Sequence, residues 1–402
     1  MAFINLLVLL YIAIANGPIY SMEFGLGSFA KNAAVPVFIF YGLSIIAKNH
    51  VRKPHQFHIV FFLFVLWNAA SLLWTAEPAT TWFQVQRYLP MVLMAYMIWD
   101  VLRTPKQFNQ AINAYVIGAA VICIQIFYSY VRGDATWNTR FSSSDFNPND
   151  LAVVVSTAVP VAWYLACSTK ATSKLLRLCY AMYPLVANIA IILSGSRGGA
   201  IAVFVADISV LLMIYNIPRR WRIATITSLV APMAITTTIN FEKSIKRLMT
   251  LFTITQESGY ISRVELWKQA LITFSQHPFL GVGSGTYIVA IRDASVRDRN
   301  LVHNTFLSVL AETGLIGFTL YGIILYLVIK MLLRQQSLLR TAFLSALVVF
   351  CLVSSTVSFE MRIQTWLFFS LLILTANCLQ PQESRKAVTA AGDARPLKLQ
   401  TP

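Results

Sequence analysis

The sequence predicts an all-α polytopic membrane protein with about twelve transmembrane helices and one large outer loop that contains helices. Hydrophobic residues make up 57% of the 402 residues and charged residues only 12%, whereas soluble domains carry about 25% charged residues. The mean hydropathy is +0.64. Apolar runs long enough to span a bilayer recur along most of the chain, and their uniformly apolar character suits helices rather than barrel strands.

The expected spans follow one another along the chain, and the first is a helix rather than a signal peptide because no basic segment precedes it. Residues 1–240 hold nine spans, residues 241–302 form the outer loop, residues 303–380 hold three spans, and residues 381–402 form a polar, disordered cytoplasmic tail. The spans lie near residues 2–16, 33–47, 57–75, 85–101, 108–131, 150–166, 175–193, 199–216, 222–240, 303–329, 340–358 and 363–380.

Lysine and arginine in the connections set the expected orientation, because cytoplasmic loops carry an excess of both. The even-numbered connections are richer in these residues than the short odd-numbered ones, so both termini are expected inside and residues 241–302 outside. The net charge of +16 is spread thinly over membrane edges, which favours contact with anionic lipids over nucleic-acid binding. The five cysteines lie in or beside apolar spans and are expected to be core residues.

The stretch "ANIAIILSGSRGGAIAVFVADISVL" joins two expected spans and places Arg197 at the membrane edge. Two roles fit an arginine there. It can bind a phosphate group beside a glycine-rich turn, or it can snorkel and fix the helix edge. Further along, Asp207 falls within the eighth span, where we expect a structural polar contact within the bundle.

The outer loop contains "ISRVELWKQALITFSQHPFLGVGSG", whose apolar residues recur at helical spacing. Ser262 and Glu265 have the spacing of a capping box. The pattern therefore predicts that Arg263 is the first helical residue, beside unpaired N–H groups that attract anions. The helix is expected to end at His277 and to be followed by a tight turn at "GVGSG". The alternative role of Arg263 is surface pairing with Glu265 or lipid phosphate.

The segment "LVHNTFLSVLAETGLIGF" begins the tenth expected span. His303 lies at its outer end, where an imidazole can take a proton from a hydroxyl group. A hydrogen bond to a neighbouring loop is the commoner role for a single histidine. Glu312 lies within the apolar run and marks either a break before Gly314 or a buried charge, and no catalytic role is assigned to it.

Three of these motifs, "SGSRGG", "SRVELWKQALITFSQHPFLGVGSG" and "HNTFLSVLAETGLIGF", occur in an order that resembles the bacterial O-antigen ligase, O-antigen polymerase and O-oligosaccharyltransferase superfamily. The loop "RFSSSDFNPNDLA" is similar to the Asn-Pro-Asn segment of that superfamily. The twelve spans and single large outer loop also fit. The compact chain and the form of the last motif favour a ligase.

The resemblance implies a GT-C-like glycosyltransferase in the bacterial inner membrane, with its active site and its large loop facing the periplasm. Its donor would be a glycan on undecaprenyl diphosphate, its acceptor lipid A–core, and transfer would invert the anomeric carbon. Arg197 and Arg263 would stabilise the diphosphate, while His303 would deprotonate or orient the acceptor hydroxyl, or contact the diphosphate as a cation. Weaker substrate-binding candidates, placed at the outer face by topology, are Arg140, Asn149, Arg87 and Arg362.

No cofactor is expected, because arginines can neutralise a leaving diphosphate without a metal ion. The sequence has no Asp-x-Asp pair, and Asp145 and Asp150 in one loop are a weak metal signal. Three rival functions remain. An O-antigen polymerase or an O-oligosaccharyltransferase would use the same donor, and a lipid or solute transporter would be a protein of another class. Against a transporter, the sequence has no repeated half with paired broken helices.

Overall fold

The structure is a computed structural model in which every regular element of the described residues is a helix. The expected span 222–240, apart from scattered positions up to 229, and the tail 381–402 lie outside the described part of the chain. The described residues are 2–17, 29–133, 141–142, 147–168, 173–217, scattered positions from 219 to 229, 258–291 and 301–379.

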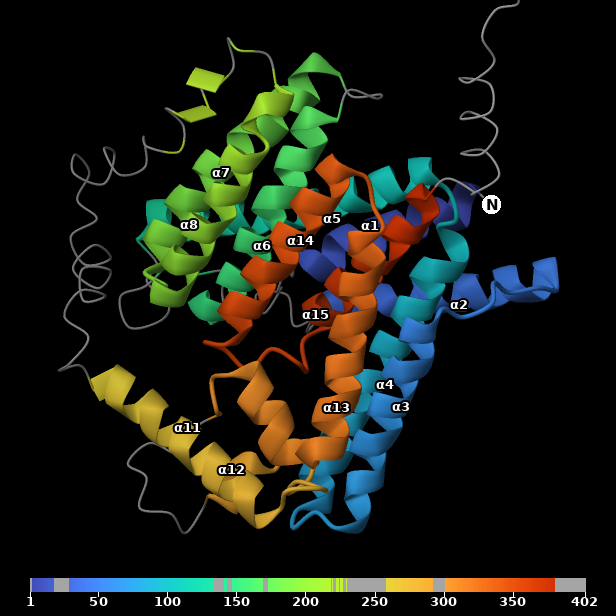
Figure 1. The fold of residues 1–402 in the computed structure, drawn as a ribbon. Coiled ribbons are helices and arrows are strands. Elements are labelled where there is room, and N and C mark those ends of the chain that lie inside the picture. The colour runs from blue at the N-terminus through green and yellow to red at the C-terminus, as the bar shows by residue number, and fades with distance from the viewer. Residues whose placement is uncertain are drawn as a thin grey trace, which may run out of the picture.

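The helices follow the order of the expected spans, with two further helices, α11 and α12, in the outer loop (Figure 1). Short 3-10 turns η2 (Ser71–Leu73), η3 (Ile214–Asn216) and η4 (Thr375–Cys378) extend three of them. The α-helices are α1 Ala2–Asn16, α2 Phe29–Lys48, α3 Gln56–Ala70, α4 Pro78–Val101, α5 Pro105–Arg132, α6 Pro148–Cys167, α7 Lys174–Ser194, α8 Arg197–Leu212, α11 Ser258–Gln276, α12 Tyr287–Ala290, α13 Thr305–Leu333, α14 Ser337–Ser354 and α15 Ile363–Leu374.

Residue types that favour helix N-termini explain many of these boundaries. Proline is the first residue of α4, α5 and α6, where its missing N–H costs no hydrogen bond. Side-chain oxygens accept hydrogen bonds from the first-turn N–H groups of α5, α6, α7, α8 and α13. The residues that provide these caps are Thr104, Asn147, Ser173, Ser196 and Asn304.

Six helical segments of the described chain are long and apolar enough to cross a membrane. The chain is therefore a multi-helix membrane protein. Three shorter apolar helices accompany them, at Ala2–Asn16, Asn32–Lys48 and Ile363–Cys378. The six longer segments are Gln56–Leu73, Pro105–Arg132, Pro148–Cys167, Lys174–Ser194, Thr305–Leu333 and Ser337–Ser354.

Helix α6 is the centre of one half of the bundle, since almost every residue along it is buried. It packs against α5, α7, α8 and α14. In the other half α3 packs against α4 and α13 (Figure 1). Asp207 on α8 accepts a hydrogen bond from Asn188 Nδ2 on α7, with 2.9 Å between the nitrogen and Asp207 Oδ2. This is the structural polar contact expected of it.

Helix α13 is not the continuous span expected near 303–329, because its backbone breaks at Gly314, with φ 64° and ψ −168°. Only glycine adopts this conformation readily. Figure 1 shows the two orange arms of α13 meeting at the kink, with the long arm running back through the bundle. The break lies immediately after Glu312 and Thr313, where one of the two interpretations of Glu312 expected it, and the Glu312 side chain is also buried.

A turn from the outer loop, residues 278–283, supplies the hydrogen bonds that the break in α13 removes. The N–H groups of Val282 and Gly283 donate to the carbonyl oxygens of Ala311 and Glu312, at 3.1 and 2.9 Å. In the other direction, Leu315 N donates to the Pro278 carbonyl oxygen at 2.8 Å. Irregular backbone at membrane depth requires such partners within the protein. The turn is therefore an integral part of α13.

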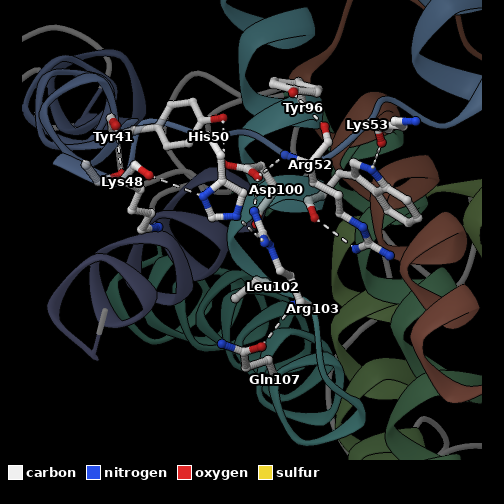
Figure 2. A network of polar contacts seen from close by, with 12 residues as sticks. Tyr41, Lys48, His50, Arg52, Lys53, Tyr96, Asp100, Leu102, Arg103 and Gln107 are labelled. Atoms are coloured by element: carbon white, nitrogen blue, oxygen red, sulfur yellow. Dashed lines mark hydrogen bonds and ion pairs between the residues drawn. The ribbon is translucent and has the colours of Figure 1, made fainter. Parts of the chain in front are cut away.

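At another end of the bundle, Asp100 organises a network that joins the α2–α3 connection to the end of α4 (Figure 2). The Asp100 carboxylate is buried and accepts hydrogen bonds from the Arg52 backbone N–H, at 2.7 Å, and from the Tyr41 hydroxyl, at 3.3 Å. Arg103 pairs with the same carboxylate, and the Arg52 guanidinium stacks on Trp99. Two connections expected to be cytoplasmic therefore lie side by side.

Candidate active site

The N-termini of α6, α8, α13 and α15 meet around the connection between α14 and α15, residues 355–362; we call this region the N-terminal cluster. Thr305 at the start of α13 donates from its hydroxyl to the Val357 carbonyl oxygen, at 2.8 Å. The same hydroxyl accepts from the Phe359 N–H, at 2.9 Å. At the start of α8, a Cβ on Gly198 would lie 2.6 Å from Thr356 Oγ1, so a larger residue would have to displace the Thr356 side chain.

A side-chain relay links the starts of α6 and α8. Asn147 Oδ1 accepts from the N–H of Asn149, at 2.9 Å, and Asn149 Oδ1 accepts from the Ser196 hydroxyl, at 2.8 Å. Ser196 Oγ in turn accepts from the Gly199 N–H, at 3.1 Å. The relay brings the Asn-Pro-Asn segment and "SGSRGG", about fifty residues apart in sequence, into contact. It fixes the half-buried Arg197 as the first residue of α8.

An ion pair links the starts of α6 and α15. Arg362 Nη2 lies 2.6 Å from Asp150 Oδ2, and the Asp150 side chain is only 9% exposed. This pairing gives Arg362 a role in holding the cluster together. It also occupies Asp150, one of the two loop carboxylates considered as a weak metal signal. The other, Asp145, lies outside the described residues.

His303 lies directly before α13, in a left-handed backbone conformation with φ 52°. The following residue, Asn304, caps α13 by accepting from the N–H groups of Phe306 and Leu307. Burial, reinforced by the positive charge of Arg263, lowers the pKa of His303 to about 4. The imidazole is therefore neutral at pH 7, with a nitrogen lone pair available to a hydroxyl proton.

Arg263 reaches His303 from α11, which packs along the start of α13. Trp267, one turn further along α11, donates from its indole N–H to the Val302 carbonyl oxygen, at 3.0 Å. Leu266 on the same face is buried with Val302 in a small core. These contacts fix the distance between α11 and the residues before α13.

The expected start of α11 is wrong by about one turn. The helix begins at Ser258, so Ser262 lies inside it and Arg263 is in its second turn rather than first. A Ser-x-x-Glu pattern does not stop a helix, because the residues before it carry no proline and continue the backbone hydrogen bonds. Arg263 therefore acts through its side-chain charge, and the unpaired N–H groups of α11 lie before it.

Two of the weaker candidates are not part of the N-terminal cluster as described. Arg140 lies outside the described residues. Arg87 lies on α4, where its guanidinium donates to Gln84 Oε1 at 3.1 Å. Gln84 packs against Gly285, since a Cβ on that glycine would lie 2.5 Å from Gln84 Cγ. Arg87 is thus placed beside the glycine-rich turn that follows α11.

Two buried carboxyl groups near this region were not assigned from the sequence. Glu360, in the α14–α15 connection, accepts from the Ser308 hydroxyl at 2.7 Å, and burial raises its pKa to about 7. Glu312 Oε2 accepts from the Gly285 N–H at 2.7 Å. The available signal for Glu360 was an acidic residue between two apolar spans, in the segment "VSFEMRIQ". No three His, Cys, Asp or Glu residues of the described chain come together as a metal-binding group.

The N-terminal cluster has the properties of an anion-binding region. Each helix N-terminus carries about half an elementary positive charge, and the four N-termini are joined by the contacts given above. Arg197 adds a guanidinium, which binds phosphate oxygens in a bidentate manner. The pair of His303 and Arg263 lies at the start of α13, one of the four helices. The region therefore brings together helix N-termini, guanidinium groups and a neutral imidazole.

Part of the chain matches a known protein family. Residues 183–322 match the family model described as O-antigen ligase. The matched stretch contains Arg197, Arg263 and His303, together with the break in α13. No curated protein matches the chain.

Proposed function

Because residues 183–322 belong to the O-antigen ligase family, we propose that the protein is a GT-C-like glycosyltransferase of the bacterial inner membrane. It transfers O-antigen glycan from undecaprenyl diphosphate to lipid A–core at the periplasmic face, with inversion and without a metal ion. The observation that carries the proposal is the meeting of four helix N-termini around residues 355–362, where Arg197 begins α8 and the pair of His303 and Arg263 lies at the start of α13. The diphosphate of a lipid-linked donor is an anion, and helix N-termini and guanidinium groups bind anions.

The donor diphosphate lies at the N-terminal cluster in this proposal. During transfer the bond between the anomeric carbon and the diphosphate oxygen breaks, and its electron pair stays on the diphosphate. The helix N-termini, Arg197 and Arg263 stabilise the negative charge that grows there. The cluster is held by Ser196, Asn149 and the ion pair of Asp150 with Arg362, so its donors are positioned before the donor arrives.

The acceptor hydroxyl of lipid A–core lies at His303. Its oxygen attacks the anomeric carbon from the face opposite the diphosphate, and its proton passes to the imidazole nitrogen. A pKa of about 4 keeps this nitrogen unprotonated at neutral pH. This low pKa favours a role for His303 as a base, or as a hydrogen-bond acceptor that orients the hydroxyl. In the donor-free protein it argues against a role as a cation that contacts phosphate. In the complex the diphosphate raises the pKa and strengthens the base.

The test is transfer by the purified protein in lipid vesicles, with undecaprenyl-diphosphate glycan as donor, with and without lipid A–core, in the presence of EDTA. A ligase gives a glycan ladder only on lipid A–core. Arg197→Ala is expected to reduce the rate by at least about 100-fold, the scale seen when a preorganised transition-state donor is lost. The matched control is Arg132→Ala, since Arg132 ends α5, stacks on Tyr128 and is assigned no part in the site.

Near-normal transfer by a folded Arg197→Ala variant would exclude the assigned role of this arginine. Longer lipid-linked chains formed without lipid A–core would identify a polymerase. Transfer to a protein acceptor would identify an O-oligosaccharyltransferase. No product with any acceptor would contradict the glycosyltransferase proposal and favour a transporter.

A further inference from the structure

An open groove with a volume of about 580 Å³ lies between the connection that follows η2 and the segment from the end of α11 to α12. Trp74 and Phe279 provide aromatic surface in it, and Thr273, Gln276 and His277 provide polar groups. Figure 1 shows α12, the end of α11 and the α3–α4 connection at the same end of the molecule. The mechanism described above makes no use of this groove.

The lining of the groove fits an uncharged polyhydroxylated ligand. Among the described residues that form it, none is Asp, Glu, Lys or Arg, so it offers a phosphate group no charged partner. The Gln276 amide and the His277 imidazole are exposed. They can donate to and accept from hydroxyl groups, and a lipid chain would leave both unpaired. The half-buried indole of Trp74 offers an apolar aromatic face. A sugar ring presents C–H faces that can pack on such a surface, and hydroxyl groups that can pair with Gln276 and His277.

The groove lies too far from Arg263 to hold the reacting sugar, but a longer glycan can span the distance. Helix α11 carries Arg263 near one end and Gln276 at the other. At a rise of 1.5 Å per residue, Gln276 lies about 20 Å along the helix from Arg263. A glycan whose first sugar is bonded to the diphosphate would therefore place a later sugar in the groove.

We propose that this groove holds a sugar of the donor glycan that lies several sugars beyond the one bonded to the diphosphate. The inference rests on the proposed function for the identity of the donor. It assigns to Trp74 the stacking surface and to Gln276 a hydrogen-bonding role. The turn 278–283 forms one wall of the groove and is held by its hydrogen bonds to α13.

The experiment compares donors of two lengths in the vesicle assay: polyprenyl diphosphate carrying one N-acetylhexosamine, and polyprenyl diphosphate carrying several repeat units. For Trp74→Ala and Gln276→Ala, the KM for the long donor is expected to rise about tenfold more than the KM for the short donor, with similar kcat values. Tenfold corresponds to about 1.4 kcal/mol. Trp74→Phe keeps an aromatic ring against Trp67, 5.3 Å away in the parent protein, and is expected to restore most of the affinity.

Matched controls come from α4, where Trp82 and Gln86 are exposed but do not line the groove. Trp82→Ala and Gln86→Ala are expected to leave the ratio of the two KM values unchanged. Arg263→Ala is expected to lose transfer from both donors. Equal effects of Trp74→Ala on both donors, or no effect on either, would overturn the proposal.

A second readout separates this proposal from the proposed function. A soluble oligosaccharide of repeat units, freed from its lipid, is added to the purified protein, and binding is followed by tryptophan fluorescence. Saturable binding that Trp74→Ala weakens supports the groove even if the parent protein transfers neither donor. Absence of binding to a protein that does transfer glycan overturns the groove and leaves the proposed function standing.

Discussion

His303 combines a left-handed backbone with a neighbouring guanidinium, and both features set its chemistry. The left-handed conformation is uncommon for a residue other than glycine. It turns the chain between Val302, which is buried against α11, and Asn304, which caps α13. The nearby charge of Arg263 adds to the effect of burial and disfavours the imidazolium form. The residue is thereby prepared to receive a proton.

The pH dependence of transfer follows from this pKa. The ratio kcat/KM reports groups of the free enzyme, so its ascending limb is expected near pH 4, with a plateau above about pH 5. In the donor complex the anionic diphosphate favours the imidazolium, so the limb in kcat is expected at higher pH than the limb in kcat/KM. Steady-state rates from pH 3.5 to 8 would measure both limbs.

Two controls belong with this experiment. His303→Gln removes the titrating group and should remove the limb from the residual activity. Intrinsic fluorescence over the same pH range shows whether the protein remains folded. A limb of kcat/KM near pH 6.5 in the folded parent protein would contradict the electrostatic pairing of His303 with Arg263.

Helix α13 and the turn 278–283 form one structural element made of two distant segments. Gly314 is essential to it, because an added Cβ would lie 2.3 Å from the Phe279 carbonyl oxygen. We expect Gly314→Ala to destabilise the protein by about 1–3 kcal/mol through backbone strain and to reduce transfer, since His303 and the N-terminal cluster depend on the first arm of α13. Thermal unfolding in detergent and the vesicle assay measure the two effects.

Gly322→Ala is the matched control for this element. Gly322 lies in the long arm of the same helix, where an added Cβ would meet no atom within 4 Å. The change is expected to be neutral or stabilising by up to about 1 kcal/mol, because alanine favours helix more than glycine does. Equal destabilisation by both substitutions would show that the break at Gly314 is not the cause.

The sequence predicted the helical elements better than their interruptions. Apolar runs located the described helices within a few residues, since burial in lipid imposes a simple composition on each span. The break in α13 was harder, because residues 303–329 have continuous apolar character and the partner of the break lies in a separate motif. The start of α11 was misplaced because Ser262 and Glu265 have the spacing of a cap without being one.

The candidate site was also predicted only in part. Arg197, Arg263 and His303 were selected from motifs, and the family match covers all three. Their contacts were not predictable. Nothing in the spacing of "NPND" and "SGSRGG" indicates that Asn149 meets Ser196. The pairing of Asp150 with Arg362 joins positions more than two hundred residues apart. Glu360 offered only the signal of an acidic residue in the connection between two apolar spans.

The molecule as a whole has one end organised by Asp100 and another that carries the N-terminal cluster and the groove. If the charge distribution sets the orientation as expected, the first end is cytoplasmic and the second is periplasmic. In a variant without its five cysteines, Ala79→Cys is expected to react with a membrane-impermeant maleimide on intact spheroplasts. Lys53→Cys is expected to react only after permeabilisation. Both side chains are exposed. The reverse pattern would invert the orientation.

The shared backbone of α13 and the turn 278–283 also limits how this protein can be recombined with its relatives. A chimera that exchanges the outer loop alone would bring a foreign turn to the carbonyl groups of Ala311 and Glu312. The unit of exchange therefore runs from the end of α11 through the first arm of α13, past Gly314. Under the proposed function, glycan specificity would therefore have to be transplanted together with the segment that contains His303.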